Sequence, residues 1–472
     1  MAGPYPVPNA TVPYWRTQLH ELDSHRSTPE LPQKQDIVII GAGFAGAALA
    51  HYLLKDGSAS SATSGKPSIT ILEAREACSG ASGRNGGHIR PDLFVGLASR
   101  MQAQGLEAAN QVASFEAANA QAVAALVAAE GIVCDLQRVT TADAFVDAGE
   151  AAKITKLWDV VKMLDCPTVR EVAHHGPADA ERATGVAGAK AAFTFPAYTV
   201  WPYRLVMHLL EGVVGRGVNL QTHTPVHGVS ETPDGEGCWR LSTPRGTLRA
   251  RRVVFATNAY TSGLLPEYDD AIYPARGTVC RAVPSPQSAP VEVPLGSCGL
   301  EMKSPATIDS YYGLRPDGSI IIGGARSAYI HKKEEWHRNY DDSTLIEPAV
   351  PYFDGWAGHT LAGWEERPVK VDRVWTGIMG YSADDVPHVG PVPSKPGLYI
   401  CAGFNGHGMP NVLLCAKGLA QMLRDGSPFS QTGIPACYET GAERLRKISR
   451  RAAAPAVSRA RADVFLKHGY GA

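Results

Sequence analysis

The apolar positions near the start of the chain form two short continuous runs separated by a helical stretch. Residues 36–40 (DIVII) are a β-branched run bounded by Lys, Gln and Gly, which is typical of a buried strand. The Ala- and Leu-rich stretch 45–54 predicts a helix, 56–68 is a small-residue loop, and 68–74 (SITILEA) predicts a second strand. Together these elements predict a βαβ unit with parallel strands and a right-handed crossover.

The rest of the chain alternates between helical and strand-like patterns. Apolar residues at helical spacing predict helices at 101–130, 151–164, 203–216 and 411–424. Short apolar or alternating runs predict strands at 143–147, 218–226, 251–259 and 398–403, and hairpins at 238–248 and 311–324. Strands like those of the βαβ unit recur along the chain, but the segments between them differ in kind. This pattern predicts one discontinuous domain that a second domain interrupts twice.

A glycine-rich motif links the first predicted strand to the first predicted helix. Residues 41–46 (GAGFAG) have the GxGxxG spacing, in which Gly41 allows the tight turn and Gly43 lets a pyrophosphate approach the backbone. Gly46 lets the helix and the strand pack closely, and the helix N-terminus attracts the anion. Glu73 ends the second strand, where an acidic residue binds the adenosine ribose, although the loop 56–67 places it further on than usual. The unit therefore predicts dinucleotide binding, with free ribose hydroxyls.

Composition narrows the possible partners. The chain has 472 residues, 44% hydrophobic and 19% charged, with a formal net charge of -1, so we expect two domains and no nucleic-acid or membrane partner. The Arg-rich end of 431–472 is expected to be a solvated helix and tail, with a nucleic-acid or membrane role as the alternative. The N-terminus lacks the pattern of a signal peptide, and no run approaches 18 apolar residues.

The nine cysteines have no metal-ligand or disulfide spacing. They are scattered, as Cys78, Cys134, Cys166, Cys238, Cys280, Cys298, Cys401, Cys415 and Cys437. An odd, dispersed set predicts reduced thiols in a cytoplasmic protein and no metal site.

Two later motifs favour FAD over NAD. The stretch 80–92 (GASGRNGGHIRPD) is a loop that can lie against a flavin diphosphate, and 403–410 (GFNGHGMP) precedes a helix whose N–H groups can point at the flavin ring. With FATNAY at 255–260 and YYGLRPDG–IIIGG at 311–324, the ordered set resembles the FAD-dependent D-amino-acid oxidase superfamily. The branch it resembles includes glycine, sarcosine and gamma-glutamylputrescine oxidases, the last most closely. The resemblance covers about residues 34–425.

The resemblance implies a set of cofactor-binding positions. It also implies that FAD lies extended, with Glu73 on the ribose, Val226 against adenine through its backbone, and the loop Ser79–Gly87 against the diphosphate and the ring. The positions it implies are Gly41, Gly43, Phe44, Ala45, Gly46, Glu73, Ala74, Arg75, Ser82, Arg84, Asn85, Gly86, Gly87, Val226, Thr257, Asn258, Asn405, Gly406, His407, Gly408 and Met409.

The implied substrate pocket is less completely specified. Tyr311 and Tyr312 open a strand, so the period of two directs one toward the flavin and the other away. Trp375 or Tyr381 is the expected pocket aromatic. We therefore take Tyr311, Tyr312, Trp375 and His407 as the catalytic candidates.

The charged residues nearby have alternative roles. Arg276 either anchors the substrate domain or contacts substrate, and Arg326 is the nearest candidate for a substrate-binding arginine. For Asp384 and Asp385 we expect structural ion pairs.

Two features depart from the relatives. The stretch 376–390, where sarcosine oxidase attaches its flavin to a cysteine, contains no cysteine, so we expect non-covalent FAD, with His88 as the alternative attachment point. We also find no lysine at the oxygen-activating position of that enzyme, which puts rapid reaction with oxygen in doubt.

The expected fold class is α/β, a Rossmann-type FAD-binding domain with an inserted α+β substrate domain built on an antiparallel sheet. The FAD-binding domain is expected to comprise 34–96, 191–274 and 371–430. The substrate domain is expected to comprise 97–190 and 275–370. A Pro-rich arm, 1–33, precedes them, and 431–472 forms the C-terminal helix and tail.

The expected function is oxidation of a C–N bond in a small amine or amino acid by hydride transfer to flavin N5, with oxygen as the acceptor. The alternatives are a dehydrogenase or biosynthetic tailoring enzyme with another electron acceptor, and a flavin-dependent binding or assembly protein without turnover. The stretches expected to face the flavin contain tyrosines and His407 but no evident carboxylate–histidine pair. We therefore expect the pocket itself to select or create the neutral amine.

Overall fold

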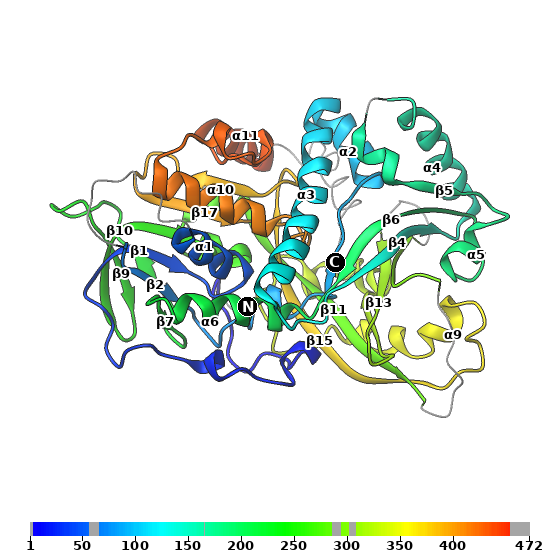
Figure 1. Cartoon of the computed structure of the whole chain (residues 1–472), viewed down its shortest axis with the longest axis horizontal. Coiled ribbons are helices and arrows are strands. Elements are labelled where there is room, and N and C mark those ends of the chain that lie inside the picture. Colours follow the sequence, from blue (N-terminus) through cyan, green and yellow to red (C-terminus); the bar gives the residue numbers. More distant parts are fainter. Residues whose placement is uncertain (1–2, 56–65, 165, 286–293, 302–307, 454–472) are drawn as a thin grey trace.

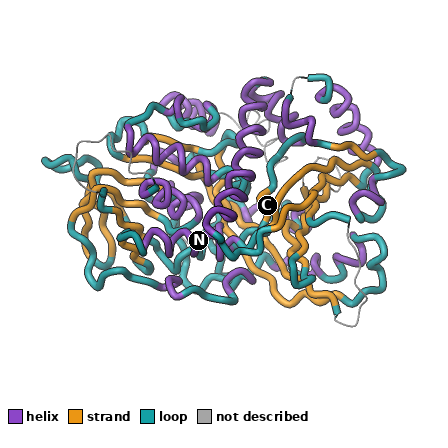
Figure 2. The backbone as a smooth tube through the Cα atoms, in the orientation of Figure 1, coloured by secondary structure: helices purple, strands orange, loops and turns teal. Residues whose placement is uncertain are grey.

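The computed structural model describes residues 3–55, 66–164, 166–285, 294–301 and 308–453. Two sheets lie side by side and form the two halves seen in Figure 1, with the long strands β11 and β15 between them. Figure 2 shows strands in both halves, with helices gathered above the sheet of the left-hand half. The predicted C-terminal tail beyond residue 453, and most of the predicted loop 56–68, lie outside the described residues.

The first sheet has a parallel centre. Its order is β16-β17-β10-β1-β2-β7, with β9 pairing β10 and β8 pairing β9. These strands are β1 (Lys34–Ile40), β2 (Ile69–Leu72), β7 (Asn219–Gln221), β8 (Gly228–Val229), β9 (Trp239–Thr243), β10 (Gly246–Phe255), β16 (His388–Pro391) and β17 (Leu398–Ala402). The chain leaves β1 toward β2 on one side, and β10 flanks β1 on the other. Ligands bind at such a switch point, beyond the carboxyl ends of the strands.

Both faces of this sheet are buried, which explains the continuous apolar run of β1. Ile37 and Ile39 join a core cluster with α1 (Phe44–Leu54), α6 (Pro202–Val214) and α10 (Val412–Asp425). Val38 and Ile40 face the opposite way, into a cluster with the β9–β10 hairpin and Ile448 of α11 (Ala442–Ala453). Alternate side chains of a strand point to opposite faces, so a strand covered on both sides has no polar face.

The second sheet is mostly antiparallel, with the order β15-β11-β14-β13-β12-β4-β6-β3, and β5 pairs β6. Its strands are β3 (His88–Ile89), β4 (Gln137–Phe145), β5 (Ala173–His175), β6 (Ala191–Thr199), β11 (Ile272–Pro284), β12 (Ser297–Glu301), β13 (Ile308–Leu314), β14 (Ile320–Gly324) and β15 (Val369–Ser382). Among the described residues, the one parallel pair in this sheet joins β12 and β4. The helices that accompany it are α2 (Val95–Gln104), α4 (Ala148–Val161), α5 (Ala180–Thr184), α7 (Arg326–Tyr329), α8 (Lys333–Trp336) and α9 (Trp356–Thr360).

Three sequence predictions need correction. β6 lies within 191–274 and most of β15 lies within 371–430, two ranges that we expect to be in the FAD-binding domain. Both strands belong to the second sheet, where β6 pairs with β4 and β15 pairs with β11 along its length. The predicted helix 101–130 is two helices, α2 and α3 (Leu106–Glu130), which meet at Gly105 with φ +91°. The predicted strand 218–226 is reduced to β7, and the chain beyond it is loop.

Helix α3 stands between the two halves (Figure 1). Among the described residues it is the one helix whose length and apolar composition match a membrane span, and half of its most apolar window is buried inside the protein. Glu116 and Asn119 on this helix are buried and hydrogen-bonded to residues of the 407–414 segment. These contacts are those of a core helix.

Candidate active site

One cavity extends from the glycine-rich motif at the end of β1 to the second sheet. Its cofactor end includes Gly41, Gly43, Phe44, Ala45, Glu73, Ala74 and Val226. Its other end includes Tyr311, Arg276, Arg326, Tyr329, Trp336 and Tyr381. The cavity therefore joins the two halves of the molecule.

The glycines of 41–46 are required by packing that the structure shows directly. Gly41 has φ +113°, and a Cβ there would lie 2.6 Å from the carbonyl oxygen of Ala256. A Cβ on Gly46 would overlap the carbonyl oxygen of Gly41. Gly43 lines the cavity, and the nearest atom to a Cβ there is Ser82 Oγ at 3.1 Å, a close contact with the end of a side chain. The start of α1 therefore lies at the cavity wall, where Ser82 Oγ accepts a hydrogen bond from Phe44 N at 2.9 Å, and a helix N-terminus beside a hydroxyl suits a diphosphate.

Glu73 joins the end of β2 to this motif. Its Oε2 accepts a hydrogen bond from Ala42 N at 2.9 Å, and its Oε1 accepts one from Arg75 N at 3.0 Å. The carboxylate is thus fixed at the cavity wall by two backbone donors. This position suits the ribose partner that the sequence predicted.

Arg75 and Arg84 line the cavity, but their guanidinium groups are engaged by Asp342. Arg75 Nη1 lies 2.9 Å from Asp342 Oδ1, and Arg84 Nε lies 3.4 Å from Asp342 Oδ2. Burial lowers the pKa of Arg84 to about 10, and Asp342 partly offsets this effect. For Arg75, burial also acts to lower the pKa, but the hydrogen bonds and charge of Asp342 outweigh it and the pKa is raised. No local pattern in the sequence indicates a role for Asp342.

The segment 79–87 lines the cavity with part of its residues and packs against the rest of the protein through Gly86 and Gly87. A Cβ on Gly86 would overlap the Tyr311 ring, and one on Gly87 would lie 2.7 Å from the carbonyl oxygen of Val200. The Asn85 side chain donates to the carbonyl oxygens of Ala81 and Ser82 and accepts from Gly87 N. Asn85 and Ser82 line the cavity, whereas Gly86 and Gly87 set the shape of the loop.

Asn258 connects the end of β10 to the 403–409 segment. Its Oδ1 accepts from Gly403 N at 3.0 Å and from Phe404 N at 3.3 Å, and its backbone has φ +44°. Thr257, beside it, also lines the cavity and has its Oγ1 2.8 Å from Thr261 Oγ1.

In the 403–409 segment itself, Phe404, Gly406, Gly408 and Met409 line the cavity. The Asn405 side chain instead accepts from Ser382 N at 2.7 Å.

His407 forms the carboxylate–histidine pair that the sequence did not reveal. Its Nε2 lies 3.0 Å from Glu116 Oε2 on α3, and neither side chain is among those lining the cavity. Glu116 also accepts from Asp92 N at 2.8 Å and pairs with Arg100 at 3.3 Å. Burial acts to raise the pKa of Glu116, but His407 and Arg100 lower it to about 2. The carboxylate comes from α3, outside the stretches that we expect to face the flavin, and His407 is directed toward α3 instead of the cavity.

At the second sheet, the two adjacent tyrosines separate as the period of two predicts. Tyr311 lines the cavity, and Gly86 and Gly323 leave room for its ring, because a Cβ on either would overlap it. Tyr312 is fully buried on the other face, where its hydroxyl donates to the carbonyl oxygen of Thr184 at 3.4 Å. Burial raises the pKa of both phenols.

Trp375 is not a pocket wall, which corrects its place among the catalytic candidates. It is fully buried, and its Nε1 donates to the carbonyl oxygen of Arg84 at 2.8 Å. Of the two aromatics considered, Tyr381 lines the cavity. The structure adds Tyr329 and Trp336, which follow β14 in the short helices α7 and α8 and which no sequence pattern had indicated.

The charged residues near this end have distinct roles. Arg276 lines the cavity, and its guanidinium donates to the carbonyl oxygens of Glu335 and Thr344, so it anchors α8 and the segment that follows it. Arg326 lines the cavity beside Tyr381. Burial raises the pKa of the Tyr381 phenol, and the charge of Arg326 partly offsets this effect. Asp384 forms the expected structural ion pair, at 2.8 Å from Arg444.

A family model described as FAD dependent oxidoreductase (DAO) matches residues 36–422. The chain belongs to this family. It is therefore an FAD-dependent oxidoreductase, and the structure fits that cofactor: the cavity-lining backbone at Gly43, the fixed carboxylate of Glu73 and the connected cavity are the features that FAD requires.

Individual relatives are more distant. Gamma-glutamylputrescine oxidoreductase of Escherichia coli (strain K12) is 22% identical over 405 residues, covering 82% of this chain and 83% of that protein. Mitochondrial dimethylglycine dehydrogenase of Rattus norvegicus is 26% identical over 244 residues, which is 48% of this chain but only 26% of that protein. The chain thus matches about a quarter of the dehydrogenase.

Solved structures share the fold. Glycine oxidase from Geobacillus kaustophilus superposes with a TM-score of 0.67 at 19% identity, covering 87% of this chain and 99% of that one. L-proline dehydrogenase from P. horikoshii superposes with a TM-score of 0.64 at 18% identity, covering 89% and 99%. The predicted fold class, an FAD-binding α/β domain with a second domain on an antiparallel sheet, is confirmed.

Proposed function

We propose that this protein oxidises a C–N bond of a small amine or amino acid, with FAD as a non-covalent cofactor and oxygen as the acceptor. The observation that carries the proposal is the continuous cavity between the diphosphate-binding backbone and a chamber of tyrosine, tryptophan and arginine side chains. When bound, the flavin supplies the two-electron acceptor for a hydride from the substrate carbon. The named relatives include oxidoreductases of amines and amino acids, which supports the substrate class.

The chamber walls are suited to a neutral amine. Among the described residues that line the cavity there is no lysine, histidine or aspartate, and the one carboxylate, Glu73, lies at the cofactor end. A free alkylamine has a pKa of about 10.4, as lysine does, so most of it is charged at neutral pH. Aromatic walls and the positive charges of Arg276 and Arg326 disfavour a second cation and lower the pKa of a bound amine. The amine then keeps the lone pair that hydride loss from carbon requires.

Arg326 gives the amino-acid form of the proposal its specific support. Its guanidinium lies at the substrate end, beside Tyr381, where a substrate carboxylate can receive charge-assisted hydrogen bonds. Arg276 is largely engaged by backbone carbonyls and contributes mainly its charge.

A dehydrogenase with another electron acceptor is the second candidate. The absence of lysine among the described cavity-lining residues favours it, because a lysine activates oxygen in the sarcosine oxidases that the sequence resembles. A cytoplasmic location is part of either proposal and is supported by nine free cysteines.

The test is a panel of amines and amino acids, read first by bleaching of the flavin without air and then by peroxide release with air. We expect several small amines or amino acids to bleach the flavin. Peroxide release at the rate of bleaching supports the oxidase, and bleaching without peroxide supports the dehydrogenase. If no amine or amino acid bleaches the flavin, the substrate class is wrong.

Non-covalent attachment has its own test. Cys401 is the one cysteine among the described cavity-lining residues, and burial raises its pKa to about 12, so its thiol stays protonated and unreactive. His88 is buried against Tyr311 and is not among the lining residues. Acid precipitation should therefore release all the yellow colour into the supernatant, and colour retained in the pellet would contradict non-covalent binding.

A further inference from the structure

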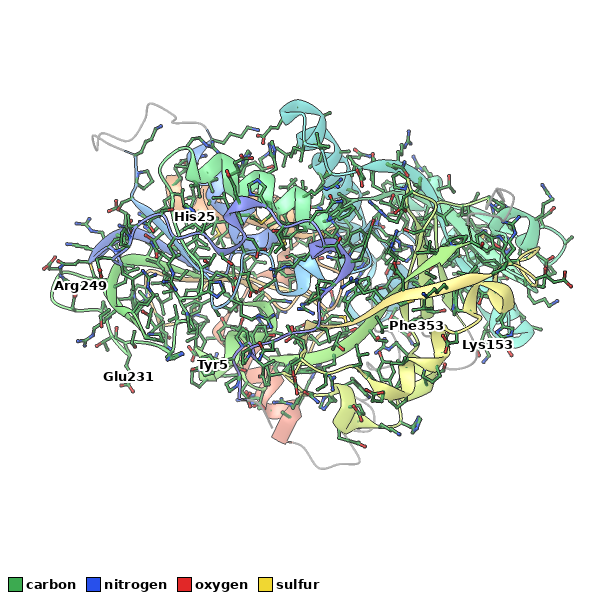
Figure 3. The ribbon with its side chains drawn as sticks, turned by 90° about the horizontal axis from the view of Figure 1, so that it is seen from below. Tyr5, His25, Lys153, Glu231, Arg249 and Phe353 are labelled. Carbon is green, nitrogen blue, oxygen red and sulfur yellow. The ribbon has the colours of Figure 1, made fainter. Side chains whose placement is uncertain are left out.

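The N-terminal arm, residues 3–33, contacts the cavity although it precedes the family match, which begins at residue 36. The sequence predicted only a Pro-rich extension here. In Figure 1 the arm runs along the lower edge of the cofactor half, and Figure 3 looks onto that face, with Tyr5 labelled. The contacts of the arm fall on three segments that border the cavity.

The first contact is at the wall around Val226. Tyr5 and Pro6 line the cavity together with Pro225 and Val226. The Tyr5 hydroxyl donates to the carbonyl oxygens of His227 and Gly263, each at 3.1 Å. The arm also packs closely here, because a Cβ on Gly263 would lie 2.6 Å from the carbonyl oxygen of Pro4. Tyr5 is therefore held in place beside the residue whose backbone is expected to contact adenine.

The second contact is with the two cavity arginines. Arg75 Nη1 donates to the carbonyl oxygen of Val7 at 3.0 Å, and Arg84 Nη1 donates to Thr11 Oγ1 at 3.1 Å. Thr11 N donates to the carbonyl oxygen of Asp342 at 2.8 Å. The arm thus completes the hydrogen bonding of the Arg75–Asp342–Arg84 cluster.

The third contact is with the 79–87 segment. Trp15 is fully buried, and its Nε1 donates to the carbonyl oxygen of Asn85 at 2.6 Å. A Cβ on Gly87 would lie 2.8 Å from the Trp15 ring, so that glycine leaves room for the arm. Trp15 is in turn held by Trp201, whose Nε1 donates to the Trp15 carbonyl oxygen at 2.8 Å.

We propose that the N-terminal arm is part of the FAD site: Tyr5 and Pro6 form the wall of its adenosine half, and Val7, Thr11 and Trp15 fix the segments that border the diphosphate. A ligand partly enclosed by the arm leaves only as fast as the arm loosens, so the arm slows FAD dissociation. It thereby retains a cofactor that no covalent bond holds. The inference rests on FAD binding, which the family establishes, and not on the proposed amine substrate.

The test compares FAD with FMN, which lacks the adenosine half, in three variants. Tyr5→Ala removes the wall, Tyr5→Phe removes only the two hydrogen bonds of the hydroxyl, and Val12→Ala is the matched control because its side chain is 55% exposed in the same arm. The dissociation rate of FAD is measured by the recovery of flavin fluorescence, and FMN affinity by titration of the apoprotein. No amine is needed, so a failed substrate panel leaves this test intact.

Tyr5→Ala should raise the FAD dissociation rate about tenfold, equivalent to about 1.4 kcal/mol, and leave FMN affinity unchanged. Tyr5→Phe should have a smaller effect, and Val12→Ala none. An unchanged FAD dissociation rate in Tyr5→Ala would overturn the proposal. So would an equal loss of FAD and FMN binding together with a lower unfolding temperature of the apoprotein, since that pattern indicates a general loss of structure.

A second measurement uses the unmodified protein. Residues 5–12 stabilise bound FAD, so bound FAD must stabilise these residues to the same extent. FAD binding should therefore slow the hydrogen exchange of their backbone amides. We expect exchange there to slow on adding FAD to the apoprotein and to slow much less on adding FMN. Equal exchange in the apoprotein, FMN and FAD forms would contradict an arm that encloses the adenosine half.

Discussion

The two ends of the cavity differ in the chemical groups that form them. At the cofactor end the main groups belong to the backbone: the turn at Gly41, the start of α1 at Gly43 and the amides that hold Glu73. At the substrate end they are side chains, contributed by β13, α7 and β15 of the second half. A site built on backbone needs glycine at fixed spacing, whereas a site built on side chains tolerates many residue types. The cofactor end can therefore be recognised in sequence and the substrate end mostly cannot.

The largest effect should come from placing a side chain on the backbone-built end. Gly43→Val should reduce FAD affinity at least about 100-fold, roughly 2.7 kcal/mol, because the side chain occupies the space that the diphosphate needs. The apoprotein should still fold, since the one contact under 3.4 Å of a Cβ at Gly43 is with Ser82 Oγ at 3.1 Å, the end of a side chain that can turn away. Flavin content after purification and apoprotein unfolding measure the two effects separately.

Gly176→Ala is the matched control, because a Cβ there meets nothing within 4 Å. It should keep stoichiometric flavin. Stoichiometric flavin in Gly43→Val would mean that the diphosphate lies elsewhere and that the backbone-built end is wrongly assigned.

The sequence predicted the parts of the molecule that follow local rules. The βαβ unit follows from periodicity and from the glycine spacing, and the opposite faces of Tyr311 and Tyr312 follow from the period of two. The sheet membership of β6 and β15 was mispredicted because it depends on pairing with β4 and β11, which lie far away in the chain. Asp342 and Glu116 were missed for the same reason: their partners are 267 and 291 residues distant, and no local pattern indicates them.

Glu116 shows that the cofactor end also depends on a side chain that does not line the cavity. It holds His407, and so the 403–409 segment, onto α3. Glu116→Gln should destabilise the protein by about 3 kcal/mol at pH 7, because a buried ion pair loses one charge. The measurement is urea unfolding with FAD present, and Glu107→Gln, on an exposed position of the same helix, is the control.

The sign of the pH dependence follows from the lowered pKa of Glu116. Its folded pKa, about 2, lies below its ordinary value of 4.5, so its contribution to stability is complete above about pH 4.5 and is lost as the pH falls toward 2. The difference in stability between the wild type and Glu116→Gln should shrink over that range. A difference that stays constant from pH 7 to pH 3 would show that the charge of Glu116 does not stabilise the fold.

The two tyrosines offer a smaller and sharper test of the substrate end. Tyr311→Phe should lower kcat/KM for the best amine about tenfold, or 1.4 kcal/mol, because it changes the polar surface of the chamber. Tyr312→Phe removes the same hydroxyl from the opposite face and should leave kcat/KM unchanged, while lowering stability by about 1 kcal/mol. Steady-state kinetics and thermal unfolding of both variants suffice. Equal kinetic effects in the two variants would contradict the assignment of Tyr311 to the chamber.

The smallest effect is expected from replacing His407, although this replacement would have the largest effect if His407 were a general base. His407 is directed away from the cavity toward Glu116, and no histidine, lysine or aspartate is among the described cavity-lining residues. The rate of flavin reduction without air should therefore rise with pH along one ionisation, that of the bound amine, and this ionisation should move when amines of different pKa are compared. His407→Asn can lower the rate through the 403–409 segment but should leave that ionisation in place. If His407→Asn abolishes the pH dependence, His407 is the base, and the 403–409 segment must rearrange from the geometry described above before substrate reacts.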